Sequence, residues 1–356
     1  MSQRAKAEVL LVIATFIWGS TFVVVKGALA DASPLPFLAA RFILAGLLIL
    51  GVMARGRLPG PTLLPCLWLG ILLFCGFAFQ TWGLVFTTPS KSAFITGFSV
   101  ILVPLISLYS GYRLRPPNVG GAALGLLGLY FLVSPSAAGA VNRGDVLTLF
   151  GAVAFAVHIV MLGHYTRRYS FLHLAPGQIL LVGIIAALAV PFGRSSVPHW
   201  TARLLFAVAV TAIFATAFAF SVQTWAQQYT PPSHAALIFA LEPVFAALTS
   251  RLVTKEHLGG KVLVGSAFIL AGMVVSEVWG GAAPAPVEGS RPDGPGNEPR
   301  AGAMAGLQVS FRRTQALSPQ MLTYGAKAIF APVKRALSFS PRRASRGSAN
   351  PRRNFT

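Results

Sequence analysis

The chain has 356 residues, of which 54% are hydrophobic and only 11% are charged, and its mean hydropathy is +0.67. Soluble domains carry about 25% charged residues, so this chain has less than half of the usual supply for a water-exposed surface. The composition therefore excludes a soluble enzyme and indicates a membrane protein. The formal net charge is +20, and residues 282–356 hold 12 basic and 3 acidic side chains, a net of +9.

Apolar runs of about 20 residues, the length that spans ~30 Å of hydrocarbon as a helix, follow one another along the first 281 positions. They lack the period-two alternation of barrel strands, which indicates helices. The first run has Ala28-Leu29-Ala30 at its end, like a signal-peptide cleavage site, but it is too long for a signal core and favours a retained span. The ten expected spans lie near 9–29, 35–54, 65–87, 92–112, 119–134, 146–164, 174–193, 204–226, 235–253 and 261–279.

Basic residues in the short loops predict the orientation. In the first half they gather on one side of the expected membrane, at Arg4, Lys6, Arg55, Arg57, Arg113, Arg115, Arg167 and Arg168. By the positive-inside rule, both termini are then cytoplasmic and the protein lies in the cytoplasmic (inner) membrane. The second half follows the rule less well, since Arg251, Lys255 and Lys261 flank the last hairpin on the outer side.

Residues 282–356 are rich in Pro, Gly, Ala, Ser and Arg and lack apolar periodicity, so we expect a disordered basic C-terminal tail. Such a tail could adsorb to anionic lipid, at about 1 kcal/mol per basic residue near the surface. An extension without a role is the alternative interpretation.

The sequence repeats itself at a spacing of 143 positions. Residues 79–95 and 222–238 are identical at eight of seventeen positions, including Gln-Thr-Trp and the Pro-Ser before the next run. With one inserted residue the match continues, since Gly128 pairs with Gly272. Matches at polar positions argue against a chance likeness of apolar segments. The repeat carries each span onto the fifth span after it, and because five is odd, the two copies enter the membrane from opposite sides.

We therefore predict an all-α integral membrane protein of ten transmembrane helices, arranged as two inverted five-helix repeats and followed by the tail. The first repeat comprises residues 1–137, the second residues 138–281 and the tail residues 282–356. Inverted copies that meet near the bilayer midplane are a recurrent architecture of secondary transporters, with the substrate cavity between them.

Several short motifs support a family resemblance: Trp18-Gly19-Ser20-Thr21-Phe22 with Lys26, Arg41-Phe42, Gly144-Asp145, Leu241-Glu242-Pro243-Val244 and Lys255-Glu256. With these motifs, the chain resembles the EamA-type transporters of the drug/metabolite transporter superfamily over about residues 9–279. The resemblance implies a ten-helix exporter of amino acids, metabolites or drugs. One position departs from it, because the first copy has Tyr112 where the second has Glu256.

Glu242 is the strongest candidate for a functional side chain, because an ionisable group within a span is costly unless it is paired or hydrated. It would contact the substrate or act as a protonatable switch, and a carboxyl that only orients helices is the alternative. Pro243 beside it loosens the helix and suits a hinge or a cavity wall. The repeat sets Glu242 against Ser99, so the cavity would be chemically asymmetric.

Other polar and aromatic residues within the spans are candidates for the same cavity. His158 lies mid-span and could exchange protons or act as a neutral hydrogen-bonding group. Gln80 and Gln223, matched by the repeat, would line the cavity or bond helices together. Trp18 lies near the middle of its span, which favours the cavity.

Trp82 and Trp225 lie nearer helix ends, which favours the membrane interface. Lys26 and Arg41 flank the first loop near Asp31, as interface anchors with snorkelling stems, as a gate, or as contacts for a substrate carboxylate. The predicted cavity residues are Trp18, Thr21, Gln80, Thr96, Ser99, His158, Gln223 and Glu242. The predicted hinge or gate residues are Lys26, Arg41, Pro104 and Pro243.

We predict a secondary transporter that exports a small polar or amphipathic metabolite by rocking the two copies about the cavity. Its energy would come from the substrate gradient or from protons carried by Glu242 and His158. The chain lacks a phosphate-cradling loop, which argues against ATP as the energy source. We expect a small-molecule substrate and the lipid bilayer as partners, with no cofactor, no metal, no catalytic residue and no nucleic acid.

The sequence leaves two points open. Gly121, Gly125 and Gly128 allow close packing of the fifth span, against a neighbour in the fold or in a homodimer. A membrane-embedded enzyme is the alternative function, but it needs a cluster of His, Asp, Glu or Cys near one membrane face, and the six histidines are scattered. A receptor or scaffold is less favoured, because neither requires an inverted duplication.

Overall fold

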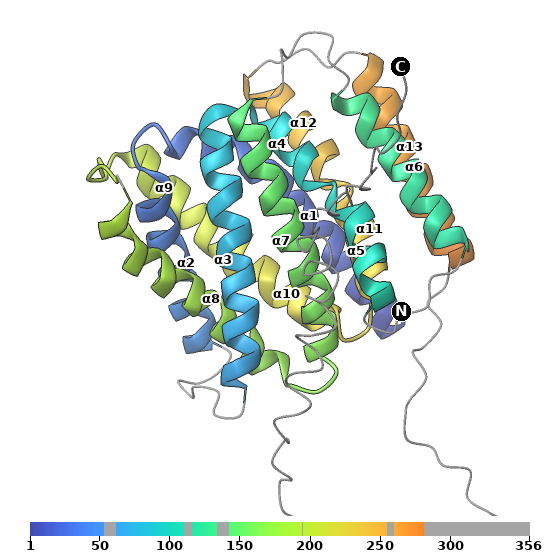
Figure 1. Ribbon diagram of the computed structural model, residues 1–356, viewed down its shortest axis with the longest axis horizontal. Helices are drawn as coiled ribbons and strands as arrows, with labels where there is room; N and C mark the ends of the chain where they lie inside the picture. Colours follow the sequence, from blue (N-terminus) through green and yellow to red (C-terminus); the bar gives the residue numbers. More distant parts are fainter. Residues whose placement is uncertain (53–61, 110–115, 134–141, 194, 255–259, 281–356) are drawn as a thin grey trace, which may run out of the picture. The chain divides into compact units, whose positions relative to one another are not determined.

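The computed structural model describes residues 1–52, 62–109, 116–133, 142–193, 195–254 and 260–280, which form helices joined by loops, with no strand among them (Figure 1). The helices are α1 (Gln3–Ala28), α2 (Pro34–Val52), α3 (Leu63–Phe86), α4 (Pro89–Thr96), α5 (Ser99–Tyr109), α6 (Pro116–Val133), α7 (Arg143–Tyr165), α8 (Phe171–Ala189), η1 (Val190–Phe192), α9 (Ala202–Val210), η2 (Thr211–Phe218), α10 (Ala219–Ala226), α11 (Pro232–Phe239), α12 (Glu242–Thr254) and α13 (Gly260–Gly280). The all-helical prediction is confirmed for this part of the chain. The predicted tail, Arg55, Arg57, Tyr112, Arg113, Arg115, Lys255 and Glu256 lie outside the described residues.

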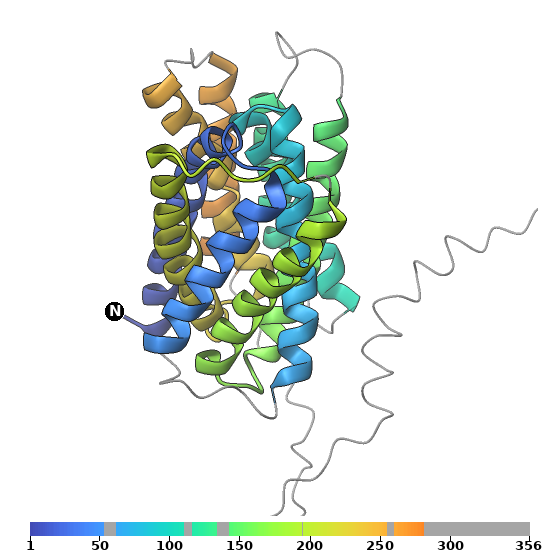
Figure 2. The same ribbon diagram turned by 90° about the vertical axis from the view of Figure 1, so that its left-hand side faces the viewer.

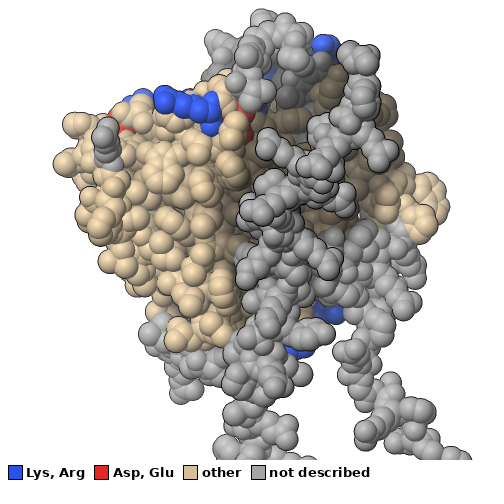
Figure 3. All heavy atoms as spheres, viewed as in Figure 1, with Lys and Arg blue, Asp and Glu red and all other residues tan. Residues whose placement is uncertain are grey.

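Within the described ranges, seven stretches are long and apolar enough to cross a membrane: Gln3–Ala28, Pro34–Val52, Leu63–Phe86, Arg143–Tyr165, Phe171–Phe192, Ala202–Ala226 and Pro232–Val253. They correspond to the first three predicted spans and to the sixth through the ninth. The other predicted spans coincide with α4–α5, α6 and α13, so the number of ten crossings stays a prediction. On the described surface in Figure 3, the visible Lys and Arg lie near the upper and lower margins, with a broad uncharged band between them. Such a band is expected where helices face lipid.

The fourth and ninth predicted spans are each broken into two helices, whereas the sequence indicated continuous ones. α4 ends at Thr96 and α5 begins at Ser99, while α11 ends at Phe239 and α12 begins at Glu242. Positions 96 and 99 become 239 and 242 when the repeat spacing of 143 is added, so the two breaks fall at matched positions.

A tight turn forms each break. The N–H of Phe98 donates to the carbonyl oxygen of Ile95 at 3.1 Å, and the N–H of Leu241 donates to that of Ile238 at 3.1 Å. This three-residue spacing is tighter than that of an α-helix. Pro243 follows in the first turn of α12, where its missing N–H has no cost. The loosening predicted at Pro243 thus coincides with a turn between two helices, and the N–H of Phe245 in α12 still donates to the carbonyl oxygen of Leu241 in that turn at 3.0 Å.

The long helices run side by side, as Figures 1 and 2 show. α3 packs along α7, α2 along α8 and α6 along α13. The largest buried clusters lie between α1, α7, α10 and α11 and between α2, α3, α8 and α10. Between α6 and α13, a Cβ at Gly272 would lie 2.5 Å from the carbonyl oxygen of Gly121 and 3.0 Å from the nitrogen of Gly125. The close packing expected of the fifth-span glycines therefore occurs within the chain.

The two broken runs begin at opposite ends of α7. At its start, Nζ of Lys91 in the first turn of α4 lies 2.6 Å from Oδ2 of Asp145. Near its other end, a Cβ at Gly163 would lie 2.6 Å from Cγ of Pro232, the first residue of α11. α7 has 23 residues. A helix of that length is about 35 Å long, which is more than the thickness of the hydrocarbon layer.

Candidate functional site

A cavity lies between α1, α2, α3, α7, α10 and the two helix breaks. It encloses about 750 Å³ of empty space, including the part that opens to the exterior. Both breaks contribute their flanking residues to its wall. The lining residues are Trp18, Thr21, Phe22, Val25, Arg41, Phe77, Gln80, Thr81, Leu84, Thr96, Ser99, Phe155, His158, Ile159, Phe220, Gln223, Phe239 and Glu242.

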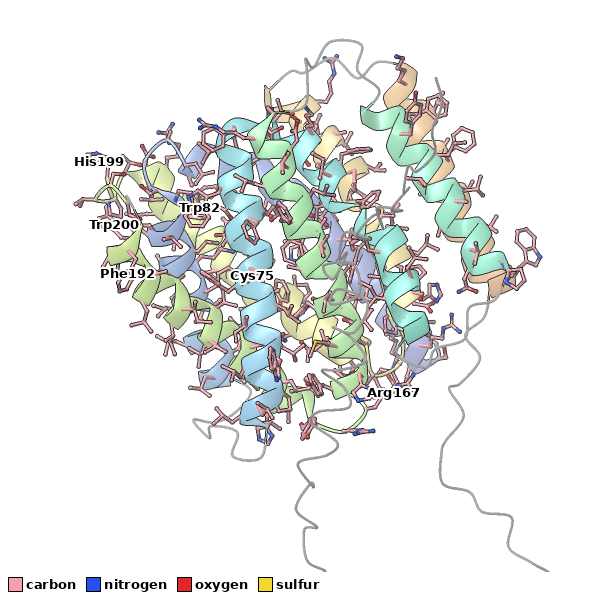
Figure 4. The ribbon with its side chains drawn as sticks, viewed as in Figure 1. Cys75, Trp82, Arg167, Phe192, His199 and Trp200 are labelled. Carbon is pink, nitrogen blue, oxygen red and sulfur yellow. The ribbon has the colours of Figure 1, made fainter. Side chains whose placement is uncertain are left out.

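All eight residues that were predicted from the sequence to line a cavity are among its lining residues. They are Trp18, Thr21, Gln80, Thr96, Ser99, His158, Gln223 and Glu242. Arg41, which was considered as an anchor, a gate or a carboxylate contact, lies on the same wall. Lys26, Pro104 and Pro243 are not among the lining residues. Trp82 and Trp225 are not among them either, and Figure 4 shows Trp82 on α3, away from the middle of that helix.

Aromatic rings form much of the wall. The indole N–H of Trp18 donates to the carbonyl oxygen of Ala215 at 2.8 Å, which fixes the ring. Its ring centroid lies 5.1 Å from that of Phe220 and 5.3 Å from that of Phe239. Phe77 extends the wall, 5.7 Å from Phe220. Binding sites for small molecules have this composition, mainly apolar and aromatic with a few convergent polar groups.

His158 belongs to a buried chain of hydrogen bonds that joins α7, α8 and α10. Its Nε2 lies 2.8 Å from Oε1 of Gln178, and Nε2 of Gln178 donates to Oγ1 of Thr224 at 3.1 Å. Because an amide oxygen only accepts, the imidazole donates from Nε2 in this network. His158 therefore joins helices and is also one of the residues that line the cavity.

The two glutamines matched by the repeat also combine both predicted roles. Nε2 of Gln80 donates to Oγ1 of Thr96 at 2.9 Å, which joins α3 to the end of α4. Nε2 of Gln223 donates to Oε1 of Gln227 at 3.2 Å, and Gln227 in turn donates to the carbonyl oxygen of Ile159 at 2.9 Å. Oε1 of Gln223 is buried and accepts no hydrogen bond from a described residue.

Arg41 is only 3% exposed, so its side chain is buried between the helices and does not extend over the surface. Its Nε donates to Oγ1 of Thr216 at 2.7 Å, and Thr216 donates to the carbonyl oxygen of Thr211 at 2.8 Å. Both threonines lie in η2, a π-helical segment. The guanidinium carbon lies 4.8 Å from the ring centroid of Phe77 and 5.1 Å from that of Phe42. A hydroxyl group and two rings thus hold this cation against the cavity.

Glu242 is the first residue of α12 and is 9% exposed. Among the described residues, its carboxyl group forms no hydrogen bond or ion pair, although it lines the cavity. Its backbone is fixed by α1, because a Cβ at Gly19 would lie 2.6 Å from the carbonyl oxygen of Glu242. Two of the 18 lining residues have a basic or acidic side chain of the Lys, Arg, Asp or Glu type, namely Arg41 and Glu242.

The sequence pattern of the EamA-like transporter family matches this chain over residues 5–134 and 142–277. The chain belongs to this family. It is 37% identical over 277 residues to an uncharacterized transporter of Archaeoglobus fulgidus, covering 77% of this chain and 86% of that protein. It is 24% identical over 293 residues to a probable amino-acid metabolite efflux pump of Escherichia coli, covering 76% and 94%. A solved crystal structure at 21% identity, with a TM-score of 0.64, covers 77% of this chain and 97% of its own, which shows a shared fold.

These matches confirm the family suggested by the motifs, and with it a multi-pass membrane protein. The relatives are named as transporters and not as enzymes, which confirms that side of the functional prediction as well. Among the described residues of this EamA-like chain, no group of three His, Cys, Asp or Glu could hold a metal ion.

Lys26 joins α1 to the end of α3 in this EamA-like chain. Its Nζ donates to the carbonyl oxygens of Leu84 at 2.7 Å, Val85 at 3.1 Å and Thr87 at 3.0 Å. The last carbonyls of a helix lack partners within the helix, and a lysine is well suited to bind them. Lys26 therefore caps α3 beside the cavity and does not enter it.

Asp31 does not pair with Lys26 or Arg41 but with Arg203 at the start of α9. Nη2 of Arg203 lies 2.7 Å from Oδ1 and its Nε lies 2.8 Å from Oδ2, while Oγ1 of Thr201 donates to Oδ2 at 2.7 Å. The hydrogen bonds from Arg203 and then from Thr201 lower the pKa of the Asp31 carboxyl to about 2. This bidentate contact ties the loop between α1 and α2 to α9.

The sequence did not single out some residues of the cavity wall, nor some residues that form hydrogen bonds with that wall. Gln178 and Thr216 are polar residues inside apolar runs, which is the same signal that led to Gln80 and Gln223. The aromatic residues Phe77 and Phe155 offered no such signal, because phenylalanines occur throughout the runs, 26 in the whole chain.

Proposed function

We propose that this chain is a secondary transporter of the cell membrane that exports a small metabolite, amino acid or drug by alternating access. One observation carries the proposal, namely that both predicted copies line one cavity. Residues 1–137 contribute Trp18, Thr21, Gln80, Thr96 and Ser99, and residues 138–281 contribute His158, Gln223 and Glu242. A cavity between two copies is where transporters built from inverted repeats bind their substrates.

Three findings support the two-copy architecture with ten crossings. The helix breaks fall at positions that differ by the repeat spacing of 143. The matched helices α4 and α11 begin at opposite ends of α7, as copies of opposite orientation require. The family pattern matches two segments, one in each copy. Broken helices at a central cavity are a recurrent device of such transporters.

In the proposed cycle, the two copies rock about the cavity so that it opens to one side of the membrane and then to the other. The breaks at Thr96–Ser99 and Phe239–Glu242 supply flexible points at membrane depth. Two lining residues could carry protons if the flux is proton-coupled. They are Glu242, through its carboxyl group, and His158, through its imidazole. The proposal has both termini in the cytoplasm, as the basic residues of the first-half loops favour.

Export follows the direction named for the Escherichia coli relative, a probable efflux pump. The test is a comparison of metabolites in the medium and in cells that do or do not express the chain, with Glu242→Ala beside the wild type. We expect at least one metabolite to rise in the medium with the wild type and not with Glu242→Ala. Gly51→Ala is the control, since a Cβ at Gly51 would meet nothing within 4 Å. Unchanged levels in the medium and unchanged uptake of all labelled metabolites into vesicles would overturn the proposal.

A further inference from the structure

The cavity wall carries one cation and one carboxyl group that do not neutralise each other. Arg41 and Glu242 both line it, but no ion pair within 4.0 Å joins them, and neither forms an ion pair with another described residue. Arg41 uses Nε for Thr216, and its two terminal nitrogens form no hydrogen bond with a described residue. The guanidinium group and the carboxyl group thus offer separate binding groups to whatever occupies the cavity.

Both groups are buried, with Arg41 3% and Glu242 9% exposed. An unpaired charge away from water is costly, so a buried carboxyl group is neutral until it meets an opposite charge, which a bound ligand can supply. The aromatic rings around Arg41 offset part of this cost, since a guanidinium binds well to ring faces. Its terminal N–H groups still match a carboxylate, which accepts two parallel hydrogen bonds.

The amide oxygen of Gln223 is a further candidate acceptor for a positively charged group of the substrate. Gln223 lines the cavity, and its Oε1 is buried and accepts no hydrogen bond from a described residue. An ammonium group donates three hydrogen bonds, and the carboxylate of Glu242 with the amide oxygen of Gln223 would accept them. The aromatic surface of Trp18, Phe220 and Phe239 completes the wall with an apolar region.

We propose that the cavity recognises a small amphipathic zwitterion, whose carboxylate binds the terminal nitrogens of Arg41 and whose ammonium binds Glu242 and Gln223. Its apolar part packs on the aromatic wall. This assignment rests on the proposed function and narrows it to one substrate class. A purely cationic substrate would leave Arg41 without a partner, and a purely anionic one would leave Glu242 so, which is how a site discriminates by unpaired groups.

The experiment uses the full chain, purified and reconstituted in liposomes. The probes are L-phenylalanine, its cationic amide and its anionic N-acetyl derivative, which share one ring and differ in charge. We expect counterflow of L-phenylalanine to exceed that of either derivative by at least tenfold. A parallel panel of labelled neutral, cationic, anionic and zwitterionic metabolites reports transport independently of these probes.

Two variants test the assignment of the charges. Arg41→Gln should lower transport of L-phenylalanine at least tenfold, so that the cationic amide becomes a better substrate than L-phenylalanine. Glu242→Gln should instead shift the preference toward the N-acetyl derivative. Opposite shifts of this kind cannot result from partial unfolding, which would reduce all three. Arg143→Gln is the matched control and should keep the wild-type preference, because Arg143 also stacks on a ring, 3.7 Å from that of Phe86, but lies outside the cavity.

The outcomes separate this inference from the proposed function. Wild-type protein that carries either derivative as fast as L-phenylalanine, or that carries from the panel only metabolites that are not zwitterions, would overturn the inference and leave transport standing. Equal losses for all three probes in both variants would do the same. Failure of every probe and every panel metabolite to cross the membrane would overturn the proposed function itself.

Discussion

The ammonium nitrogen of Lys91 lies 2.6 Å from a carboxylate oxygen of Asp145, and the two side chains are 15% and 6% exposed. This pair ties the first turn of α4 to the first turn of α7. The repeat matches Lys91 with His234, in the first turn of α11, and Nη2 of Arg4 in α1 donates to Nδ1 of His234 at 2.8 Å. The start of α4 is thus bound to α7, and the start of α11 is bound to α1. In both cases the partner helix belongs to the other predicted copy.

In the proposed transport cycle, opening of the cavity at the start of α7 would separate Lys91 from Asp145. Asp145→Asn keeps an oxygen to accept from the Asn142 N–H, as Oδ2 does at 2.9 Å, but it removes the charge. The loss of about 1 kcal/mol of attraction should favour opening about fivefold. The measurement is the labelling rate of Thr21→Cys by an impermeant thiol reagent applied from that side, in a chain without Cys66 and Cys75. Arg203→Gln should not alter the rate, and an unchanged rate in Asp145→Asn would remove the pair from the gating step.

Gly19 sets the distance between α1 and the start of α12. A Cβ there would lie 2.6 Å from the carbonyl oxygen of Glu242 and 3.0 Å from the nitrogen of Ala246, and backbone atoms cannot move aside easily. Gly19→Ala should therefore cost about 1–3 kcal/mol of stability and reduce transport. The control Gly51→Ala has open space and should be neutral or stabilising by up to about 1 kcal/mol. Thermal unfolding in detergent measures both, and equal melting temperatures for the two variants would contradict the close approach of α1 and α12.

The pair of Asp31 and Arg203 predicts a pH dependence of stability. The folded pKa of Asp31 is lowered to about 2, whereas an unfolded aspartate has a pKa of about 3.9. The contribution is therefore present in full above about pH 4 and is lost as the pH falls toward about 2. Asp31→Asn should melt at a lower temperature than the wild type near neutral pH, and this difference should shrink below about pH 4. A difference that stays constant across this range would show that the carboxylate charge is not what stabilises the loop.

The predicted orientation can be tested at two exposed positions. Figure 4 shows Arg167 near one end of the helices and His199 and Trp200 toward the other. In whole cells that express a chain without native cysteines, an impermeant thiol reagent should label His199→Cys but not Arg167→Cys. Permeabilised cells should label both, which controls for accessibility. Labelling of Arg167→Cys alone in intact cells would reverse the topology.

The cavity residues could be predicted because of the medium in which they lie. Polar side chains such as Gln80, Gln223, His158 and Glu242 are conspicuous within apolar runs, since hydrocarbon tolerates few of them. The repeat then related residues on different spans, for instance Ser99 and Glu242, which both flank a break on the cavity wall. These two signals sufficed to name side chains that the fold gathers around one space.

The breaks themselves were not predictable from hydropathy, because a tight turn within an apolar run changes no residue type. Pro243 suggested a weak point, but Gly97 and Phe98 in the first copy gave no comparable sign. The surroundings of Arg41 were not predictable either, since its place beside the first loop left an anchor, a gate and a carboxylate contact open. Only the fold shows that Thr216 accepts from its Nε at 2.7 Å and that two rings stack on its guanidinium.

The π-helical segment η2 has a consequence for the whole site. Thr216 and the carbonyl group of Ala215, both in η2, hold Arg41 and Trp18 respectively. A wide turn of this kind contains one residue more than an α-helical turn, and each residue of an α-helix advances the chain by about 100°. Deletion of one residue from η2 would turn α9 about its axis relative to α10 and carry one of these acceptors out of reach. The wide turn of η2 thus sets where Thr216 meets Arg41, 175 positions away in the sequence.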